Sequence, residues 1–201
     1  STSLLAEPLG PSLGIQAQLP ILLAEYPFRT QQDIADYLHL LQDLPRYFSD
    51  LIALEQEKSR QGVFQNDLAV DGIIRQCSAF LADADTPESH LLHTVFQNKL
   101  QASSLFSEAE RNLCLQTHEK LLISCVFPAY RSLSDALSSL RGKGTQNAGG
   151  LSRQEDGLSY YAYLLRSRVG VNASPEELTR LLTQQLADQC AEMQIILDQN
   201  P

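Results

Sequence analysis

The stretch that decides the fold covers residues 107–142 and reads SEAERNLCLQTHEKLLISCVFPAYRSLSDALSSLRG. It begins with Ser107 and Glu110, a serine and a glutamate at the spacing of a helix capping box. The helical pattern continues to Leu140, and Gly142 is a typical residue just beyond a helix end. Because Pro128 has no backbone N–H to donate, we expect the helix to kink or split near residues 125–127.

Start signals upstream of this stretch predict further helices. Thr30 can cap a helix over residues 31–43, and a second helix can begin at Pro45 and run to residue 60. In that second helix Glu55 and Lys58 are expected on a solvated face. Two more start signals follow, Asn66 or Asp67 for a third helix and Thr86-Pro87 for a fourth.

Proline and glycine mark the segments between and before the helices. Residues 1–29 hold four prolines and two glycines, which predicts an irregular lead-in with an extended stretch over residues 15–28. Four of the ten residues 141–150 are glycine, which predicts a loop. Beyond it, Asp156 can cap a short helix that ends near Gly170, and Ser174-Pro175 with Glu177 begins a final helix.

These patterns predict an all-α fold, a bundle of about six to eight helices, because no strand alternation persists beyond the lead-in. The predicted parts are an irregular lead-in (1–29), a helical core (30–141), a Gly-rich loop (142–157) and C-terminal helices (158–201), together one domain. The chain has no initiator methionine and its last helix lacks a completing element, so we expect a fragment of a longer protein.

Composition indicates a globular protein and argues against two classes of partner. Hydrophobic residues make up 43% of the 201 residues and charged residues 19%. Fifteen Lys and Arg against 24 Asp and Glu give a net charge of −9. A nucleic-acid binder or a protein of anionic membrane surfaces needs a basic face, so we expect neither contact.

The cysteines and histidines indicate no metal centre within this chain. Cys114 and Cys125 lie eleven residues apart in one helical stretch, or roughly 16 Å, too far for a disulfide, so we expect free thiols. His90 and His93 share a helix face, which is half of a zinc site, but they belong to no HExxH sequence. We therefore predict no metal ligands, no cofactor and no catalytic residues in this chain.

Two features leave a binding role open. The Gly-rich loop does not match the phosphate-binding pattern GxxxxGK[ST], so it is either a structural loop or a place where Gly149 and Gly150 let a ligand approach the backbone. Tyr160, Tyr161 and Tyr163 can pack in the core or place a phenol in a cleft.

Several motifs in a fixed order carry a resemblance. They are LLAEYPFRT (22–30), DIADYL (33–38), PRYF (45–48), EQEKS (55–59), QGVF (61–64), FPAY (127–130), GGL (149–151), Gly157, YY (160–161), LLR (164–166) and SPEE (174–177). Together they resemble the bacterial family catalogued as domain of unknown function 885, over most of residues 15–187.

The resemblance implies a larger, zinc-dependent context. Members of this family are similar to zincin-type metallopeptidases, with a His-Glu-x-x-His helix downstream of the motifs present here, and many look exported or lipid-anchored in the envelope. Zinc and a peptide substrate are therefore implied for the full-length protein. The missing C-terminal half is then the expected partner of this chain.

The leading hypothesis is that this chain is the helical portion of a zinc-dependent peptidase-like protein and is inactive alone. Carried over onto this sequence, the resemblance points to Gly149, Gly150, Tyr160, Tyr161 and Arg166 as residues that line the substrate cleft. The alternative is a non-catalytic helical binding or scaffolding domain.

Overall fold

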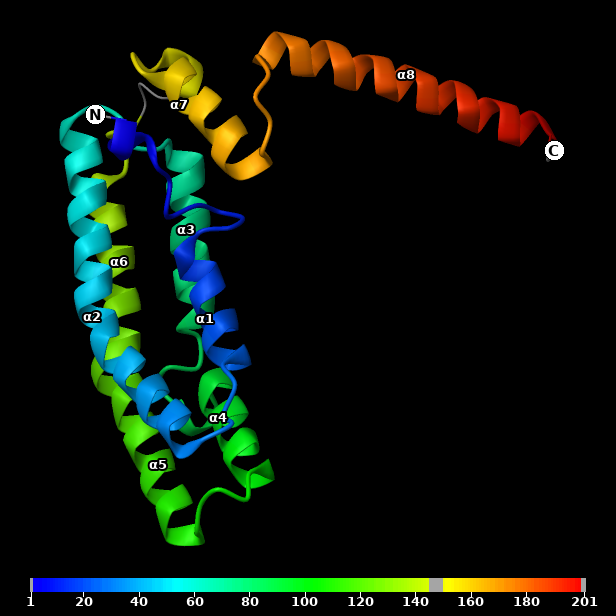
Figure 1. Cartoon of the computed structure of the whole chain (residues 1–201). Helices are drawn as coiled ribbons and strands as arrows, with labels where there is room; N and C mark the ends of the chain where they lie inside the picture. Colours follow the sequence, from blue (N-terminus) through cyan, green and yellow to red (C-terminus); the bar gives the residue numbers. More distant parts are fainter. Residues whose placement is uncertain (1, 145–149, 200–201) are drawn as a thin grey trace. The chain divides into compact units, whose positions relative to one another are not determined.

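The computed structural model describes residues 2–144 and 150–199 (Figure 1). Among these residues there is no β-strand, so the predicted all-α fold is confirmed. The α-helices are α1 (Ile15–Glu25), α2 (Gln31–Arg60), α3 (Asp67–Phe80), α4 (Leu91–Ala102), α5 (Glu108–Leu121), α6 (Phe127–Leu140), α7 (Gly157–Leu164) and α8 (Pro175–Gln199).

The chain divides into two compact units. Ser3–Gly149 form the first, called here the bundle unit, and Gly150–Pro201 together with Ser1–Thr2 form the second, the C-terminal unit.

In the part of the chain that the structure describes, no helix is both long and apolar enough to cross a bilayer.

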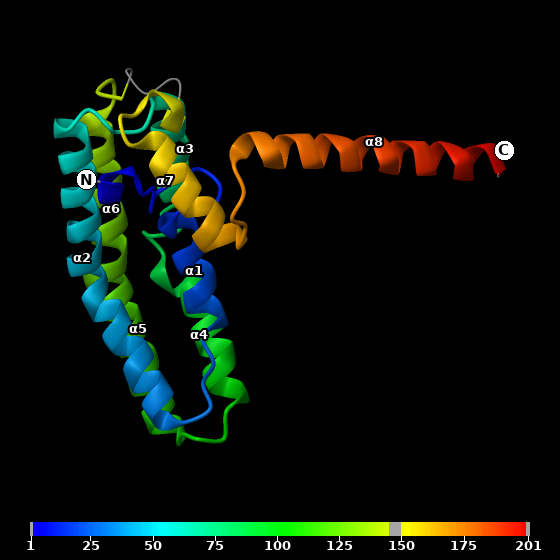
Figure 2. The same ribbon diagram turned by 45° about the horizontal axis from the view of Figure 1, so that its top comes forward.

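The bundle unit is built from two groups of helices that meet at a common core. The 30-residue helix α2 packs against α5, α6 and the π-helical segment Leu122–Val126, whereas α1 packs against α3 and α4. Figures 1 and 2 show these two groups side by side, and contacts between α3 and α6 join them. The fully or almost fully buried residues at the centre include Leu9, Ile34, Leu41, Phe48, Val70, Ile73, Leu92, Phe96, Val126, Leu133 and Leu137.

Local capping signals place most helix starts correctly. Thr30 and Asp33 form a reciprocal capping box at the start of α2, and Ser107 and Glu110 do the same for α5. The Asn66 side chain accepts a hydrogen bond from the Ala69 N–H at the start of α3. Each of these caps satisfies N–H groups that have no partner within the helix.

The prediction for residues 15–28 is wrong, because residues 15–25 form α1 rather than extended backbone. Pro20 lies inside this helix and cannot donate to the carbonyl of Gln16, four residues earlier. The Tyr130 hydroxyl on α6 donates to that carbonyl instead, at 3.0 Å. At the C-terminal end of α1, Lys99 Nζ donates to the carbonyls of Ala24 (2.5 Å) and Tyr26 (2.8 Å).

The prediction that Pro45 begins a separate helix is also wrong. Pro45 lies inside α2, on its exposed side. The buried face of the helix continues past it through Leu41, Leu44 and Phe48. Packing of that face against the core therefore keeps the helix continuous although Pro45 removes one backbone hydrogen bond.

Two other prolines shape the chain near their expected positions. The predicted break before Pro128 is confirmed, since the π-helical segment Leu122–Val126 separates α5 from α6. The predicted helix at Thr86-Pro87 begins later than expected. Pro87–Ser89 form one 3-10 turn, and α4 starts at Leu91, where the side chain of His90 caps it.

The C-terminal unit consists of short segments followed by one long helix. A 3-10 turn (Gly150–Arg153) leads to α7. Asp156, at the N-cap position before this helix, makes no side-chain cap hydrogen bond, contrary to the prediction. A π-helical segment (Leu165–Val169) then ends at Gly170, which adopts the left-handed conformation with φ 76°. Before α8, Ser174 and Glu177 exchange the two hydrogen bonds of a capping box, as predicted.

Candidate functional site

The residues predicted to line a cleft lie in the C-terminal unit, except Gly149, which is outside the described residues. Gly150 begins the 3-10 turn with a positive φ of 61°. Tyr160 is half-buried and its ring stacks on that of Tyr163, with 6.0 Å between centroids. Tyr161 is 42% exposed, and Arg166 is exposed on the π-helical segment.

Tyr160 and Tyr161 are neighbours on α7, so their side chains point about 100° apart around the helix axis. The structure thus pairs Tyr160 with Tyr163 and leaves Tyr161 open to solvent. The roles assigned to Gly149, Gly150, Tyr160, Tyr161 and Arg166 remain predictions.

A cluster of aromatic rings and histidines fills one part of the bundle unit. The Tyr37 hydroxyl lies 3.2 Å from His118 Nε2, and His118 Nδ1 lies 3.4 Å from His93 Nδ1. The His118 ring stacks on Phe96 with 4.2 Å between centroids. Burial, reinforced by His93 and His90, lowers the pKa of His118 to about 3, so this imidazole is neutral near pH 7.

This cluster does not have the donors that a zinc site needs. His118 is followed by Glu119, but Leu122 stands where an HExxH sequence has its second histidine. In the described ranges no group of three His, Cys, Asp or Glu side chains could hold a metal ion. The zinc that the resemblance implies therefore does not fit the residues described here, and His93 and His118 serve as packed core residues.

A buried ion cluster lies near the C-terminal end of α2, where the sequence analysis expected a solvated face. That expectation is wrong for Glu55 and Lys58, whose side chains are 1% and 0% exposed. Lys58 Nζ lies 2.7 Å from Glu7 Oε2 and 3.7 Å from Glu55 Oε1. Burial raises the pKa of Glu55 to about 7, although the Lys58 ammonium opposes the shift.

The sequence carried one usable signal for this burial. Glu55 and Lys58 are spaced four and seven residues after Leu51, and Leu51 belongs to the buried face of α2. This spacing places all three on one side of a helix. Charged side chains at such positions are rarely fully buried, which is why the sequence favours a solvated face for Glu55 and Lys58.

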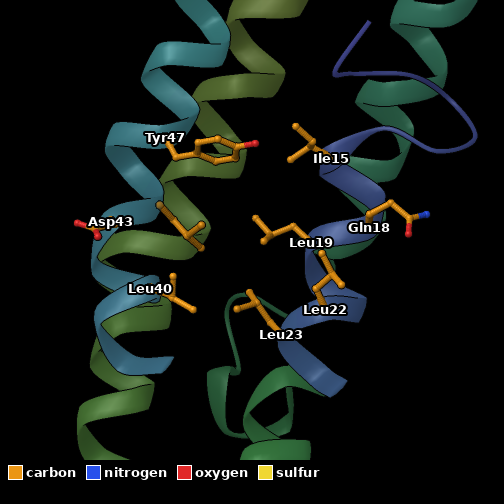
Figure 3. A pocket seen from close by; sticks show the side chains of 9 residues that line it. Ile15, Gln18, Leu19, Leu22, Leu23, Leu40, Asp43 and Tyr47 are labelled. Carbon is orange, nitrogen blue, oxygen red and sulfur yellow. The ribbon is translucent and has the colours of Figure 1, made fainter. Parts of the chain in front are cut away.

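An apolar groove of about 380 Å³ lies between α1 and α2 (Figure 3). Leu19 and Leu23 from α1 point toward Leu40 on α2, while the polar ends of Gln18 and Asp43 point away from the hollow. Its volume falls within the range of small-ligand pockets. The groove was not predicted from the sequence, because residues 15–25 were expected to be extended rather than helical. The lining residues are Ile15, Gln18, Leu19, Leu22, Leu23, Leu40, Asp43, Leu44 and Tyr47.

Comparison with known proteins identifies a family and a fold. The family model described as "Bacterial protein of unknown function (DUF885)" matches residues 4–201. Among curated proteins, none matches this chain significantly.

A solved structure, described as "the putative lipoprotein from Colwellia psychrerythraea", has the same fold with a TM-score of 0.83 and 18% sequence identity. The match covers 96% of this chain and 33% of that chain. The present chain thus spans about one third of the length of the solved chain that it matches.

Proposed function

Because this chain belongs to the DUF885 family of bacterial proteins, we propose that it forms the helical part of a longer, zinc-dependent peptidase-like protein. The observation that carries the proposal is the match of 96% of this chain to 33% of a longer solved chain. The peptidase-like character rests on the motif resemblance described above. In this proposal the zinc ligands belong to a part of the longer protein that lies outside these 201 residues.

The C-terminal unit is proposed to supply one wall of the substrate cleft. Tyr161 and Arg166 are exposed, so both are accessible to a ligand. A phenol can donate a hydrogen bond to a developing oxyanion, and a guanidinium can bind a peptide carboxylate in a bidentate manner. Gly149 and Gly150 would let a peptide backbone pass close to the chain.

We further propose that the protein is exported or anchored in the envelope. The description of the Colwellia neighbour as a lipoprotein supports this location. The resemblance to exported family members supports it as well.

The proposal is tested on the full-length protein, with Tyr160→Phe and Tyr161→Phe as variants and Tyr163→Phe as the control. Tyr163 lies on the same helix and is 54% exposed, but it is not among the proposed cleft residues. We expect kcat/KM for a short peptide to fall about tenfold or more in at least one of the two variants and to stay unchanged in the control.

Zinc analysis of the same samples separates the parts of the proposal. The full-length protein should retain zinc after dialysis, and the 201-residue chain should neither retain zinc nor hydrolyse peptides. A full-length protein that retains no zinc and cleaves no peptide contradicts the proposed function. Unchanged kinetics in both tyrosine variants would remove Tyr160 and Tyr161 from the cleft.

A further inference from the structure

A buried ammonium connects the first residues of the bundle unit to α2. Lys58 Nζ donates to the Ala6 carbonyl at 3.0 Å and pairs with Glu7 Oε2 at 2.7 Å. Leu5 and Leu9 on either side are buried. Residues 3–7, called here the N-terminal strap, therefore contact α2 through Lys58 at both Ala6 and Glu7.

A second carboxylate competes for the same ammonium. Glu55 Oε1 lies 3.7 Å from Lys58 Nζ, and neither oxygen of Glu55 has a hydrogen-bond partner among the described residues. The Glu55 side chain is 1% exposed, whereas that of Glu7 is 47% exposed. Glu7 can therefore exchange Lys58 for water, but Glu55 cannot.

The charge of the cluster depends on one proton. The charged groups that act on Glu55 are Lys58 on its own helix and Glu7 on the strap. With Glu55 protonated, one ammonium faces one carboxylate and the cluster is neutral. With Glu55 ionised, two carboxylates share one ammonium, and the buried carboxylate has the greater need of it.

We propose that Glu55, Lys58 and Glu7 form a proton-controlled latch that holds the N-terminal strap against α2 when Glu55 is protonated and releases it when Glu55 ionises. On release, Lys58 turns from Glu7 to Glu55, and the Glu7 carboxylate moves into water. The pKa of about 7 for Glu55 places this change near neutral pH.

Hydrogen exchange of the strap amides tests the latch on the 201-residue chain between pH 5.5 and 8.5, with rates corrected for the intrinsic effect of pH. In the wild-type chain we expect protection of amides 4–7 to fall about tenfold or more as pH rises. Glu55→Gln, which mimics the protonated acid, should stay protected at every pH. Glu7→Gln should be less protected than the wild type at low pH, because the strap then offers no carboxylate to Lys58.

Glu57→Gln is the matched control. Glu57 is on the same helix, pairs with Arg60 and has a side chain that is 37% exposed. Hydrogen bonding to Gln61 lowers its pKa, so it does not titrate in this range. This variant should follow the wild-type profile. A wild-type strap whose protection does not change with pH contradicts the latch. Equal pH dependence in Glu55→Gln and the wild type contradicts it as well.

Discussion

His118 and Glu55 are buried ionisable residues whose titrations affect stability in opposite directions. The folded-state pKa of His118, about 3, is below its ordinary value of 6.5. Its contribution to the free energy of unfolding is therefore complete above pH 6.5 and is lost as pH falls toward 3. The folded-state pKa of Glu55, about 7, is above its ordinary value of 4.5, so its contribution is complete below pH 4.5 and is lost as pH rises to 7.

Each titration changes the free energy of unfolding by about 1.4 kcal/mol per pH unit, so between pH 4.5 and 6.5 the two slopes cancel. We therefore expect the two titrations together to leave the free energy of unfolding of the wild-type chain nearly constant over this interval. Glu55→Gln removes one slope, so its stability relative to wild type should rise by about 3 kcal/mol from pH 4.5 to 7. Urea denaturation at several pH values measures this difference, and a constant difference would contradict the assigned titration.

Gly144 tests close packing at a single backbone position. A Cβ at this position would overlap the carbonyl oxygen of Gln65, and backbone atoms cannot easily move away. We expect Gly144→Ala to destabilise the bundle unit by about 1–3 kcal/mol in urea denaturation. Gly10→Ala is the control, because a Cβ there meets nothing within 4 Å, and its effect should stay within about 1 kcal/mol.

At the scale of a helix, α1 depends on residues that are distant in sequence. Its interior Pro20 leaves the buried carbonyl of Gln16 to the Tyr130 hydroxyl. Tyr130→Phe removes that donor and leaves the carbonyl without its partner. We expect a loss of about 1–2 kcal/mol in the free energy of unfolding.

Tyr47→Phe is the matched control for this change. Tyr47 is 42% exposed, so water replaces any partner of its hydroxyl. Its removal should change stability by less than about 0.5 kcal/mol. Equal losses for the two variants would show that the Tyr130 hydroxyl does not support α1.

Local sequence signals predicted the helices whose ends are capped by their own neighbours. The capping boxes of α2 and α5 involve residues three positions apart, so short-range patterns are sufficient to find them. The helix α1 could not be predicted in this way, because the groups that satisfy its carbonyls, Tyr130 and Lys99, come from α6 and α4. The prediction that a separate helix begins at Pro45 failed for a related reason, since packing against the core keeps α2 continuous there.

The candidate sites were predictable to a smaller extent. Tyr160, Tyr161 and Arg166 were selected by family motifs, and the structure places them on α7 and the segment after it. The Glu7–Lys58–Glu55 cluster joins residues about 50 positions apart, and the apolar groove joins two helices of which only one was expected. Both require the tertiary fold.

For the molecule as a whole, the relevant feature is an exposed apolar stripe on α8. None of its described residues is buried: Leu178 is partly buried, and the other large apolar side chains are 48–62% exposed. Leu178, Leu182, Leu186, Met193 and Ile196 recur at helical spacing and form one stripe. Stripes of this kind usually mark surfaces of association.

We expect the 201-residue chain to self-associate with rising concentration in sedimentation velocity experiments. Leu182→Glu combined with Leu186→Glu should make it monomeric, because two carboxylates interrupt the stripe. Gln184→Glu combined with Ala191→Glu adds the same charge to the opposite face and should leave association unchanged. A wild-type chain that remains monomeric at all concentrations, or equal effects of the two pairs, would contradict this role of the stripe.

The pairing of α2 with α6 also has a consequence for synthesis on the ribosome. Helix α2 is complete at residue 60, but α6 ends at residue 140. At a translation rate of about 5–20 residues per second, the apolar face of α2 waits roughly 4–16 s for its main partner. The nascent chain therefore presents Leu41, Phe48 and their neighbours to chaperones during this interval, and the bundle unit can close only after α6 has been synthesised.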